Sequence, residues 1–235
     1  SRYELEPYIP HFARFSEANG LAVLEIGLGL GADHEQFAKA GAKTHGIDLT
    51  PRAVELTRLR LELQGLSSDL RVGDAEALPY ADNSFDVVYS WGVIHHSPDT
   101  QKAASEILRV LKPGGSFRVM IYHTWSLVGL MLWLRYGLGR GRPFMSLAEI
   151  YSSYLESPGT KAYTRDEAEK LFSPVDELEI QIELTHGDLL ESGAGQRHEG
   201  RLLDFARRIW PRWFLRRAAR NFGLFLLISG LKPKP

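Results

Sequence analysis

Three glycines at alternate positions follow an apolar run near the start of the chain. The run covers residues 23–26, leads into Gly27, Gly29 and Gly31, and is followed by a helical pattern over residues 32–38. Glycine allows a tight turn and lets the backbone approach a ligand without an intervening Cβ. The helix start behind such a loop offers N–H groups to an anion. The spacing therefore predicts a strand, a loop and a helix that together hold a nucleotide-like cofactor.

A carboxylate at the end of the next predicted strand narrows the choice of cofactor. Asp48 ends this strand, residues 44–48, and Thr50-Pro51 then starts a helix. The glycine loop also satisfies the G-x-G-x-x-A form of the dinucleotide fingerprint, in which such an acid binds a ribose. NAD and S-adenosylmethionine both carry a ribose, so the loop and Asp48 alone fit either cofactor.

Side chains able to move a proton follow the fourth and fifth predicted strands. His95 and His96 come after the fourth strand, and Tyr122 and His123 end the fifth. Histidine exchanges a proton near neutral pH, so His95, His123 and Tyr122 are candidate catalytic residues. A structural interpretation stays open, because His95 and His96 also fit a role in bracing the helix that follows.

The elements that must position these residues alternate between strand and helix. Right-handed crossovers between parallel strands favour a doubly wound sheet with helices on both faces, and ligands then bind outside the carboxyl ends of the strands. The helix before the fifth strand is expected to open at Ser97-Pro98, and Pro113-Gly114-Gly115 to end it and turn the chain. Strands are expected at residues 23–26, 44–48, 70–72, 85–90, 117–122, 178–184 and 222–229.

The alternation breaks after Tyr122. Residues 125–134 are apolar on all sides but too few to span a membrane, and helical patterns follow at 146–156 and 164–172. We expect one domain with a cofactor-binding core at 1–123, a helical lid at 124–172, and C-terminal strands with a basic helix at 173–235. Aromatic side chains of the lid fit either a pocket for an apolar substrate or ordinary packing: Tyr151, Tyr154, Tyr163, Trp125 and Trp133.

Composition excludes several classes of protein. The 235 residues are 44% hydrophobic and 24% charged, which is ordinary for a water-soluble globular protein. The absence of cysteine excludes disulfides and thiol chemistry. The eight histidines form no cluster with metal-ligand spacing, so no metal site is expected. No signal peptide is recognisable after Ser1, and we expect a cytoplasmic protein.

Positive charge is concentrated toward the C-terminal end. Residues 197–235 hold ten Lys and Arg against two Asp and Glu, although the net charge of the chain is −1. Such a segment fits a surface for phosphates or anionic lipid, or else a solvated helix face. Together with the apolar stretch 125–134, it motivates the hypothesis of peripheral contact with an anionic membrane. The remainder of the chain is acidic, so no nucleic-acid partner is expected.

Five segments between residues 20 and 123 form a recognisable set. They are 23–31 (VLEIGLGLG), 46–50 (GIDLT), 73–80 (GDAEALPY), 85–90 (FDVVYS) and 108–115 (LRVLKPGG). In order and spacing the set resembles the class I S-adenosylmethionine-dependent methyltransferases, specifically the type 11 branch that includes ubiquinone- and menaquinone-biosynthesis enzymes. The resemblance implies a Rossmann-like α/β sheet of seven strands, the last one antiparallel, with a helical lid inserted after the fifth strand.

The resemblance also implies a role for each motif residue. Asp48 would accept hydrogen bonds from both ribose hydroxyls. Leu49 would pack on the adenine face, and Asp74 with the Ala75 N–H would meet the adenine amino end. The glycine loop and Glu25 would hold the methionine end, and the end of the fourth strand would line the methyl side. The cofactor residues so implied are Glu25, Gly27, Gly29, Gly31, Asp48, Leu49, Asp74, Ala75, Ser90 and Trp91.

The function implied by the resemblance is methyl transfer from S-adenosylmethionine to a small, hydrophobic acceptor, on oxygen or carbon, with S-adenosylhomocysteine as product. This is an in-line displacement on an activated cofactor, so the protein mainly positions the acceptor and excludes water. Two alternatives stay open. A nicotinamide-dependent oxidoreductase also fits the loop and Asp48, and a non-catalytic S-adenosylmethionine-binding module fits the whole motif set.

Overall fold

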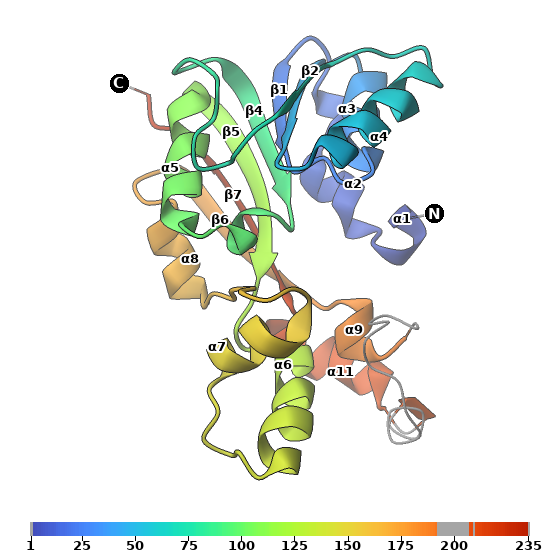
Figure 1. Cartoon of the computed structure of the whole chain (residues 1–235), viewed down its shortest axis with the longest axis vertical. Helices are drawn as coiled ribbons and strands as arrows, with labels where there is room; N and C mark the ends of the chain where they lie inside the picture. Colours follow the sequence, from blue (N-terminus) through green and yellow to red (C-terminus); the bar gives the residue numbers. More distant parts are fainter. Residues whose placement is uncertain (1, 192–206, 209, 235) are drawn as a thin grey trace. The chain divides into compact units, whose positions relative to one another are not determined.

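The computed structural model describes residues 2–191, 207–208 and 210–234. Its central feature is a sheet of seven strands in the order β3-β2-β1-β4-β5-β7-β6 (Figure 1). Strands β1 to β5 are parallel to their neighbours, and the last strand is antiparallel, which confirms the predicted α/β fold. The strands are β1 (Ala22–Ile26), β2 (Lys43–Asp48), β3 (Asp69–Val72), β4 (Phe85–Trp91), β5 (Leu111–Tyr122), β6 (Asp176–Glu183) and β7 (Phe225–Leu231).

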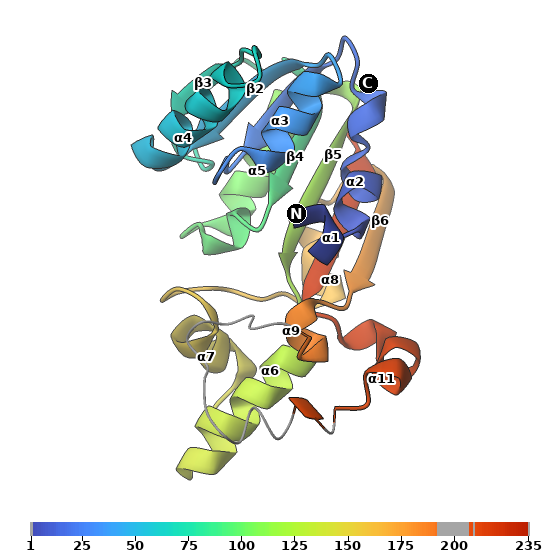
Figure 2. The same ribbon diagram turned by 90° about the vertical axis from the view of Figure 1, so that its right-hand side faces the viewer.

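Helices cover both faces of this sheet, as the two ribbon views show (Figures 1 and 2). Helices α2, α3 and α4 lie on one face, and α5 and α8 lie on the other. This is the arrangement that right-handed crossovers produce. The helices concerned are α1 (Arg2–Leu5), α2 (Tyr8–Ala13), α3 (Ala32–Lys39), α4 (Pro51–Glu62), α5 (Thr100–Val110) and α8 (Arg165–Leu171), with 3₁₀ turns at Phe15–Glu17 and Ile94–His96.

Aromatic rings fill the space between α3 and the sheet. The ring of Phe37 in α3 lies 4.8 Å from that of Phe15 and 5.4 Å from that of Tyr89 in β4, both in edge-on contacts. All three side chains are buried. Such contacts contribute about 0.5–1.5 kcal/mol each beyond the burial of area. They fix α3, and with it the glycine loop that precedes it, against the sheet.

The strand register brings the predicted site residues to one edge of the sheet. Ile26 lies opposite both Ile47 and Ser90, and Asp48 lies opposite Val72. Because these strands run in the same direction, the loops that follow them start side by side. This carboxyl edge is where open α/β sheets bind their ligands.

The structure corrects two predicted boundaries around α5. The helix begins at Thr100 rather than at Ser97-Pro98, because the carboxylate of Asp99 caps it by accepting the Lys102 N–H, and the preceding residues form a 3₁₀ turn. The chain is already extended from Leu111, so residues 113–115 do not end a helix. They belong to an irregular part of β5, where the register against β4 shifts.

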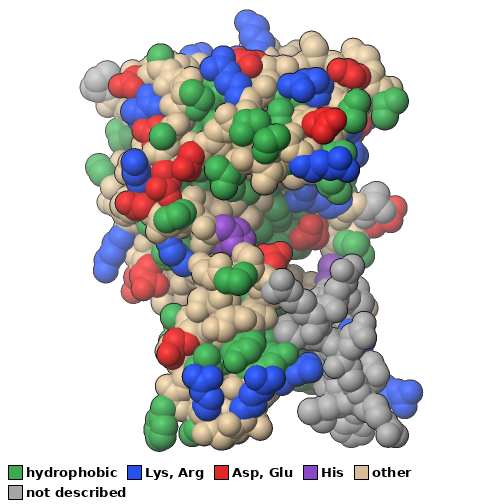
Figure 3. Space-filling model, in the orientation of Figure 1, with side chains coloured by type: hydrophobic (Ala, Val, Ile, Leu, Met, Phe, Trp, Pro, Cys, Tyr) green, Lys and Arg blue, Asp and Glu red, His purple; other side chains and the backbone are tan. Residues whose placement is uncertain are grey.

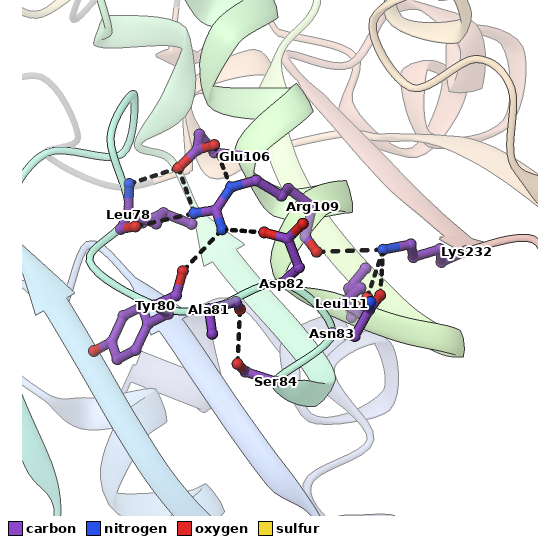
Figure 4. A network of polar contacts seen from close by, with 10 residues as sticks. All are labelled: Leu78, Tyr80, Ala81, Asp82, Asn83, Ser84, Glu106, Arg109, Leu111 and Lys232. Carbon is purple, nitrogen blue, oxygen red and sulfur yellow. Dashed lines mark hydrogen bonds and ion pairs between the residues drawn. The ribbon is translucent and has the colours of Figure 1, made fainter.

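The guanidinium group of Arg109 ties the end of α5 to the loop between β3 and β4 (Figure 4). It donates to the backbone carbonyls of Leu78 and Tyr80 at 3.0 and 2.8 Å. It also pairs with Asp82 at 2.7 Å and with Glu106 at 2.6 Å. Arg109 therefore contributes several of the contacts that hold the far end of the loop that carries Asp74.

Replacing Arg109 by methionine should destabilise the protein by about 1–2 kcal/mol. Hydrogen bonds to a charged group contribute about 1.5–3 kcal/mol each, but this side chain is 31% exposed, so solvent screening reduces the loss. Urea unfolding measures the change. Arg58→Met, at an exposed position of α4, is the matched control. Equal stability of the two variants would contradict the role of Arg109.

The chain forms two compact units. Unit 1 comprises residues 1–121, 166–180 and 227–235, and unit 2 comprises residues 122–165 and 181–226. Unit 2 therefore contains most of the expected lid together with part of the C-terminal segment. Residues 192–206 and 209 of that segment lie outside the described residues. Unit 2 contains α6 (Leu127–Leu132), α7 (Leu147–Ile150), α9 (His186–Leu189) and α11 (Arg212–Ala218), π-helical turns at Trp133–Gly137 and Tyr151–Leu155, and 3₁₀ turns at Leu138–Arg140 and Arg220–Phe222.

A buried carboxylate links the segments of unit 2. Asp188 of α9 accepts hydrogen bonds from the N–H groups of Val128, Thr185 and Leu224 at 3.1, 2.9 and 2.9 Å. These donors belong to α6, to the cap of α9 and to the residue before β7. One side chain thus holds three stretches of unit 2 together. Within the described ranges, no helix has both the length and the apolar character needed to cross a membrane.

Candidate functional site

The glycine loop adopts a backbone that few other residues tolerate. Gly27, Gly29 and Gly31 have φ angles of +85°, +54° and +71°. A Cβ at Gly27 would overlap Val93, and one at Gly31 would lie 2.8 Å from Thr57 Oγ1, whereas one at Gly29 would meet nothing within 4 Å. The loop is therefore packed at both ends and open in the middle. This is the cradle that close approach of a cofactor requires.

Asp48, at the end of β2, is hydrogen-bonded to the backbone of the glycine loop. One carboxylate oxygen accepts the N–H groups of Leu28 and Gly29 at 2.9 and 3.3 Å. The other accepts the N–H and the hydroxyl group of Thr50 at 2.9 and 2.8 Å. A carboxylate has about four acceptor sites. The longest bond, to Gly29, is the one that ribose hydroxyls would displace most easily.

Residues after β2 and β3 suit an adenine ring. Leu49 is 72% exposed, so it presents apolar surface at the carboxyl edge. Asp74 accepts the Glu76 N–H through Oδ1 at 2.9 Å, and its second oxygen makes no hydrogen bond to the residues that the structure describes. Ala75 follows and is partly buried. An unused carboxylate oxygen is an acceptor for an exocyclic amino group.

The two predicted residues at the end of β4 have different surroundings. Ser90 is fully buried, and its hydroxyl group has no hydrogen-bond partner in the described part of the chain. Trp91 packs against α2, with ring centroids 6.2 Å from Tyr8 and 6.1 Å from Phe12. Ser90 therefore offers an unused hydrogen-bonding group at the carboxyl edge, whereas Trp91 anchors the N-terminal helices.

Glu25 ends a chain of buried and partly buried hydrogen bonds. Its Oε2 lies 2.9 Å from Nδ1 of His34, and Nε2 of His34 lies 2.8 Å from the Ser68 hydroxyl oxygen. That hydroxyl donates its only proton to the Thr44 carbonyl at 2.7 Å, so it must accept from Nε2. Nδ1 of a neutral His34 is then an acceptor. Glu25 therefore donates to it as a protonated acid.

Burial accounts for both protonation states. Desolvation raises the pKa of Glu25, and the neighbouring carboxylates of Asp33 and Asp48 raise it further, against an opposing effect of Arg2. Desolvation lowers the pKa of His34 to about 4. Before it makes the predicted contact with the ammonium group of a cofactor, Glu25 is therefore a neutral carboxyl group. A nearby cation would favour its ionised form.

Near pH 4.5, replacing Glu25 by glutamine should preserve the free energy of unfolding, because the amide N–H can still donate to His34. Alanine should cost about 1–3 kcal/mol, because it leaves a buried acceptor unpaired. The folded protein binds a proton at Glu25 that the unfolded chain releases above about pH 4.5. The wild type should therefore lose stability relative to Glu25→Gln as pH rises from there. Urea unfolding over a pH series measures both effects, and a glutamine variant no more stable than the alanine variant would contradict the assignment.

A second buried carboxylate, which reasoning from motifs missed, holds the N-terminal helix. Asp33 accepts hydrogen bonds from the hydroxyl groups of Tyr3 and Tyr89 at 2.9 and 2.8 Å, and its Oδ2 lies 3.2 Å from the guanidinium group of Arg2. The available signal was the run of ionisable side chains at residues 33–35, at the start of a helix that packs on a buried strand. All three of these side chains are buried.

The candidate catalytic residues belong to different units. His95 in unit 1 is fully buried, and its ring centroid lies 4.2 Å from that of His96. Tyr122 in unit 2 donates its hydroxyl proton to Glu156 at 2.8 Å, and its ring stacks on Phe225. A catalytic role for either residue stays a prediction.

His123 has a defined tautomer. Its Nδ1 lies 3.0 Å from the carbonyl oxygen of Gly223, which can only accept, so Nδ1 carries the proton and Nε2 carries the lone pair. Burial lowers the pKa of His123, and the bond to Gly223 opposes this shift. At neutral pH the side chain is therefore an uncharged imidazole with a basic Nε2. This is the form that a general base needs.

The three tyrosines predicted to bind substrate have different surroundings within unit 2. Tyr151 is fully buried, and its hydroxyl group is hydrogen-bonded inside the unit. Tyr154 stacks on Tyr136 with ring centroids 4.2 Å apart. Tyr163 forms a short backbone bridge with His123. Each tyrosine thus has a packing role, and contact with an acceptor stays a prediction.

Unit 2 also contains an apolar pocket of about 320 Å³. The indole N–H of Trp133 donates to the Met145 carbonyl at 3.1 Å and fixes one wall. The size and the apolar lining suit a small apolar molecule or part of one. The walls include both tryptophans of the predicted aromatic pocket: Trp125, Leu127, Leu130, Trp133, Met145 and Phe222.

These features together define a class of protein. A doubly wound sheet presents an open glycine cradle, an acid at the end of β2, an exposed leucine and an acid after β3 at one carboxyl edge. These groups fit the ribose and adenine of an adenosine cofactor. Among the residues described, no group of three or more His, Asp or Glu side chains is placed to hold a metal ion.

Comparison with known proteins shows which family part of this chain resembles. Residues 24–119 match the family described as a methyltransferase domain. A ubiquinone biosynthesis O-methyltransferase of Cereibacter sphaeroides is 35% identical over 144 residues, which cover 56% of this chain and 57% of that protein. An uncharacterized protein of Mycobacterium bovis is 37% identical over 113 residues, covering 48% of this chain and 41% of its own length. The chain thus spans only about half the length of such curated relatives.

A solved structure supports the same fold over nearly the whole chain. Phosphoethanolamine N-methyltransferase 2 of Haemonchus contortus, in complex with phosphomonomethylethanolamine and S-adenosylhomocysteine, superposes with a TM-score of 0.68 at 21% identity, covering 98% of this chain and 52% of that one. Residues 24–119 are therefore similar to the domains of class I S-adenosylmethionine-dependent methyltransferases, as the five sequence segments predicted. The nicotinamide alternative, which rested on the glycine loop and Asp48, gains no support from these matches.

Proposed function

We propose that this chain transfers the methyl group of S-adenosylmethionine to a small, apolar acceptor, on an oxygen or a carbon atom. The observation that carries the proposal is the register of β1, β2 and β4, which brings the open glycine cradle, Asp48 and Ser90 to one edge. The methyltransferase-domain match supports methyl transfer as the reaction. The 35% identity to a ubiquinone biosynthesis O-methyltransferase supports an oxygen acceptor.

The apolar nature of the acceptor is inferred from the pocket in unit 2. Its walls are formed almost wholly by tryptophan, leucine, methionine and phenylalanine side chains. Burying apolar surface there yields about 25 cal/mol per Å². A strongly polar acceptor would lose hydrogen bonds to water that these walls do not replace. An aromatic or prenylated phenol combines an apolar body with a hydroxyl group to methylate.

The chain contributes mainly by binding and orientation. S-adenosylmethionine supplies a methyl group that is already activated for displacement, so correct placement of the acceptor accounts for much of the rate. In this proposal Asp48 binds the ribose, Asp74 and Leu49 bind the adenine, and the glycine loop receives the methionine end. Asp33 and Asp48 lie close enough to raise the pKa of Glu25, and this acidic surrounding favours a positively charged cofactor.

Replacing His123 by asparagine should lower kcat by about 10²–10⁴-fold on a hydroxyl acceptor if His123 is the general base. Asparagine can still donate to the Gly223 carbonyl but has no counterpart of Nε2. Because burial lowers the pKa of His123, the acid limb of the wild-type kcat profile should lie below pH 6.5 and should vanish in the variant. Steady-state kinetics from pH 5 to 8 measure both.

Affinity for S-adenosylmethionine and stability toward urea should not change in His123→Asn, since the structural hydrogen bond is retained. An equal kcat with an unchanged acid limb would assign His123 a packing role only. The same kinetics on His95→Asn and Tyr122→Phe would then identify which of the other candidates acts as the base.

Two measurements test the proposed function as a whole. Calorimetric titration should show micromolar binding of S-adenosylmethionine and S-adenosylhomocysteine and none of NADH. Release of S-adenosylhomocysteine should then depend on a phenolic, prenylated acceptor and not on phosphoethanolamine. Cofactor binding without turnover on any phenol or carbon acceptor would favour the non-catalytic module instead. Binding of NADH alone would overturn the proposal.

A further inference from the structure

A row of leucines lies exposed along one helical stretch of unit 2. Leu130, Leu134 and Leu138 follow one another at intervals of four residues along α6 and the two turns that continue it, and they are 49%, 46% and 51% exposed. Residues four apart share one face of a helix. Phe144, in the loop that follows, is 98% exposed. We call these four side chains the leucine row.

The leucine row continues into the apolar pocket. Leu130 belongs both to the row and to the pocket wall, and exposed Trp125 and Phe222 form further parts of that wall. The pocket of about 320 Å³ therefore opens among side chains that already face solvent. Contiguous exposed apolar surface of this kind marks a contact site rather than ordinary surface.

Cations border the row. Arg135, Arg140 and Arg142 are exposed, and the guanidinium group of Arg140 lies over the Tyr136 ring at 4.8 Å, which holds it in place. The space-filling view shows Lys and Arg side chains beside apolar ones in the lower part of the molecule, over the region of α6 and α7 (Figure 3). The described residues of unit 2 contain eleven Lys and Arg against five Asp and Glu.

A second element of unit 2 has the same character. In α11, Trp213 and Phe214 are exposed together with Arg217, and Arg216, which is also exposed, pairs with Glu191. Arg212 is not part of this surface, because it donates to the carbonyl oxygens of Leu189 and Leu190 and anchors the helix to α9. Unit 2 thus presents exposed aromatic and leucine side chains together with arginines from two separate elements.

We propose that unit 2 docks on the surface of an anionic lipid bilayer through the leucine row and its bordering arginines. Leucine, tryptophan and phenylalanine side chains beside basic ones are the chemistry of helices that lie in the plane of a membrane interface. Each arginine near such a surface gains attraction from anionic headgroups. A second copy of this chain is a less suitable partner for this surface, because the arginines of the two copies would face one another. The inference goes beyond the proposed function, since docking needs no acceptor.

Vesicle flotation with the full chain tests the proposal. The protein should float with vesicles of phosphatidylcholine mixed with phosphatidylglycerol at low salt, and should remain behind with pure phosphatidylcholine or at high salt. Arg140→Ala combined with Arg142→Ala should weaken binding about fivefold for each charge removed. Leu134→Asp combined with Leu138→Asp should weaken it by about tenfold or more, since two apolar anchors are lost.

Matched double variants in unit 1 serve as controls. Arg52→Ala with Arg58→Ala, and Leu59→Asp with Leu63→Asp, change exposed residues of α4 and its cap and should float like the wild type. Titration with S-adenosylmethionine checks that each variant is folded. Absence of flotation, equal flotation with neutral vesicles, or equal losses in the controls would overturn the proposal. So would light scattering that shows a dimer dissociated by the Leu134→Asp, Leu138→Asp pair.

Discussion

Replacing Asp48 by alanine should raise the dissociation constant of S-adenosylmethionine by about ten- to a hundredfold. Loss of a charged hydrogen-bond acceptor costs about 1.5–3 kcal/mol. Here the carboxylate has two tasks, because it is the proposed ribose ligand and also holds the N–H groups of Leu28 and Gly29. Calorimetric titration with S-adenosylmethionine and S-adenosylhomocysteine measures the loss, which should be similar for both ligands because they share the ribose.

Two further variants serve as comparisons for Asp48→Ala. Asp48→Asn keeps one acceptor oxygen and should lose less affinity than Asp48→Ala. Glu55→Ala removes an exposed carboxylate from α4 and should bind like the wild type. If Asp48→Ala retained full affinity, the cofactor would not bind at the end of β2.

Alanine at Gly27 should destabilise the fold by about 2–5 kcal/mol. The residue has a φ of +85°, and a left-handed backbone costs about 1–2 kcal/mol for a residue with a side chain. The added Cβ would also overlap Val93, and such overpacking costs about 1–3 kcal/mol. Urea unfolding measures the loss. Adding Val93→Ala to the variant should restore part of it.

Gly29→Ala is the matched comparison for Gly27→Ala. Its φ of +54° carries a similar backbone cost, but its Cβ would point into open space. The expected loss of stability is therefore only about 1–2 kcal/mol, while affinity for S-adenosylmethionine should fall because the Cβ occupies the cradle. Equal stability losses at both positions, with unchanged cofactor affinity at Gly29, would show that the loop has no open side.

The cofactor-binding half of the fold could be predicted from local sequence. Strands β1 and β4 are mostly apolar, β2 ends in the carboxylate of Asp48, and a glycine follows each of β1, β3 and β4. Asp48 could be placed beside the glycine loop because parallel strands share a carboxyl edge, a rule that needs no knowledge of side-chain packing. The register of β1 against β2 agrees with it.

The partners of the buried carboxyl groups could not be predicted in the same way. Asp33 is bound by Tyr3 and Tyr89, which are 30 and 56 residues away, and no periodicity links these positions. The hydrogen bond from Glu25 to His34 joins β1 to α3. The sequence does not determine how α3 is rotated about its own axis. Such contacts depend on tertiary packing rather than on local preference.

The second half of the chain gave weaker signals for a related reason. Residues 181–226 join the expected lid segment through Asp188, whose three backbone donors lie in separate stretches. Nothing in the pattern around Asp188 distinguishes it from an ordinary helix-capping acid. Tyr151 likewise resembles a surface aromatic of an amphipathic helix in sequence, yet it is fully buried.

The way the chain passes between the two units bears on how the proposed acceptor specificity could change among homologues. It crosses four times, after residues 121, 165, 180 and 226, and three of these crossings fall inside β5, β6 and β7. Unit 2 therefore cannot be exchanged between homologues as one continuous cassette. A chimera needs four matched junctions, three of them in hydrogen-bonded strands. Diversification by point substitution in the pocket walls should be the easier route, for evolution and for the protein engineer alike.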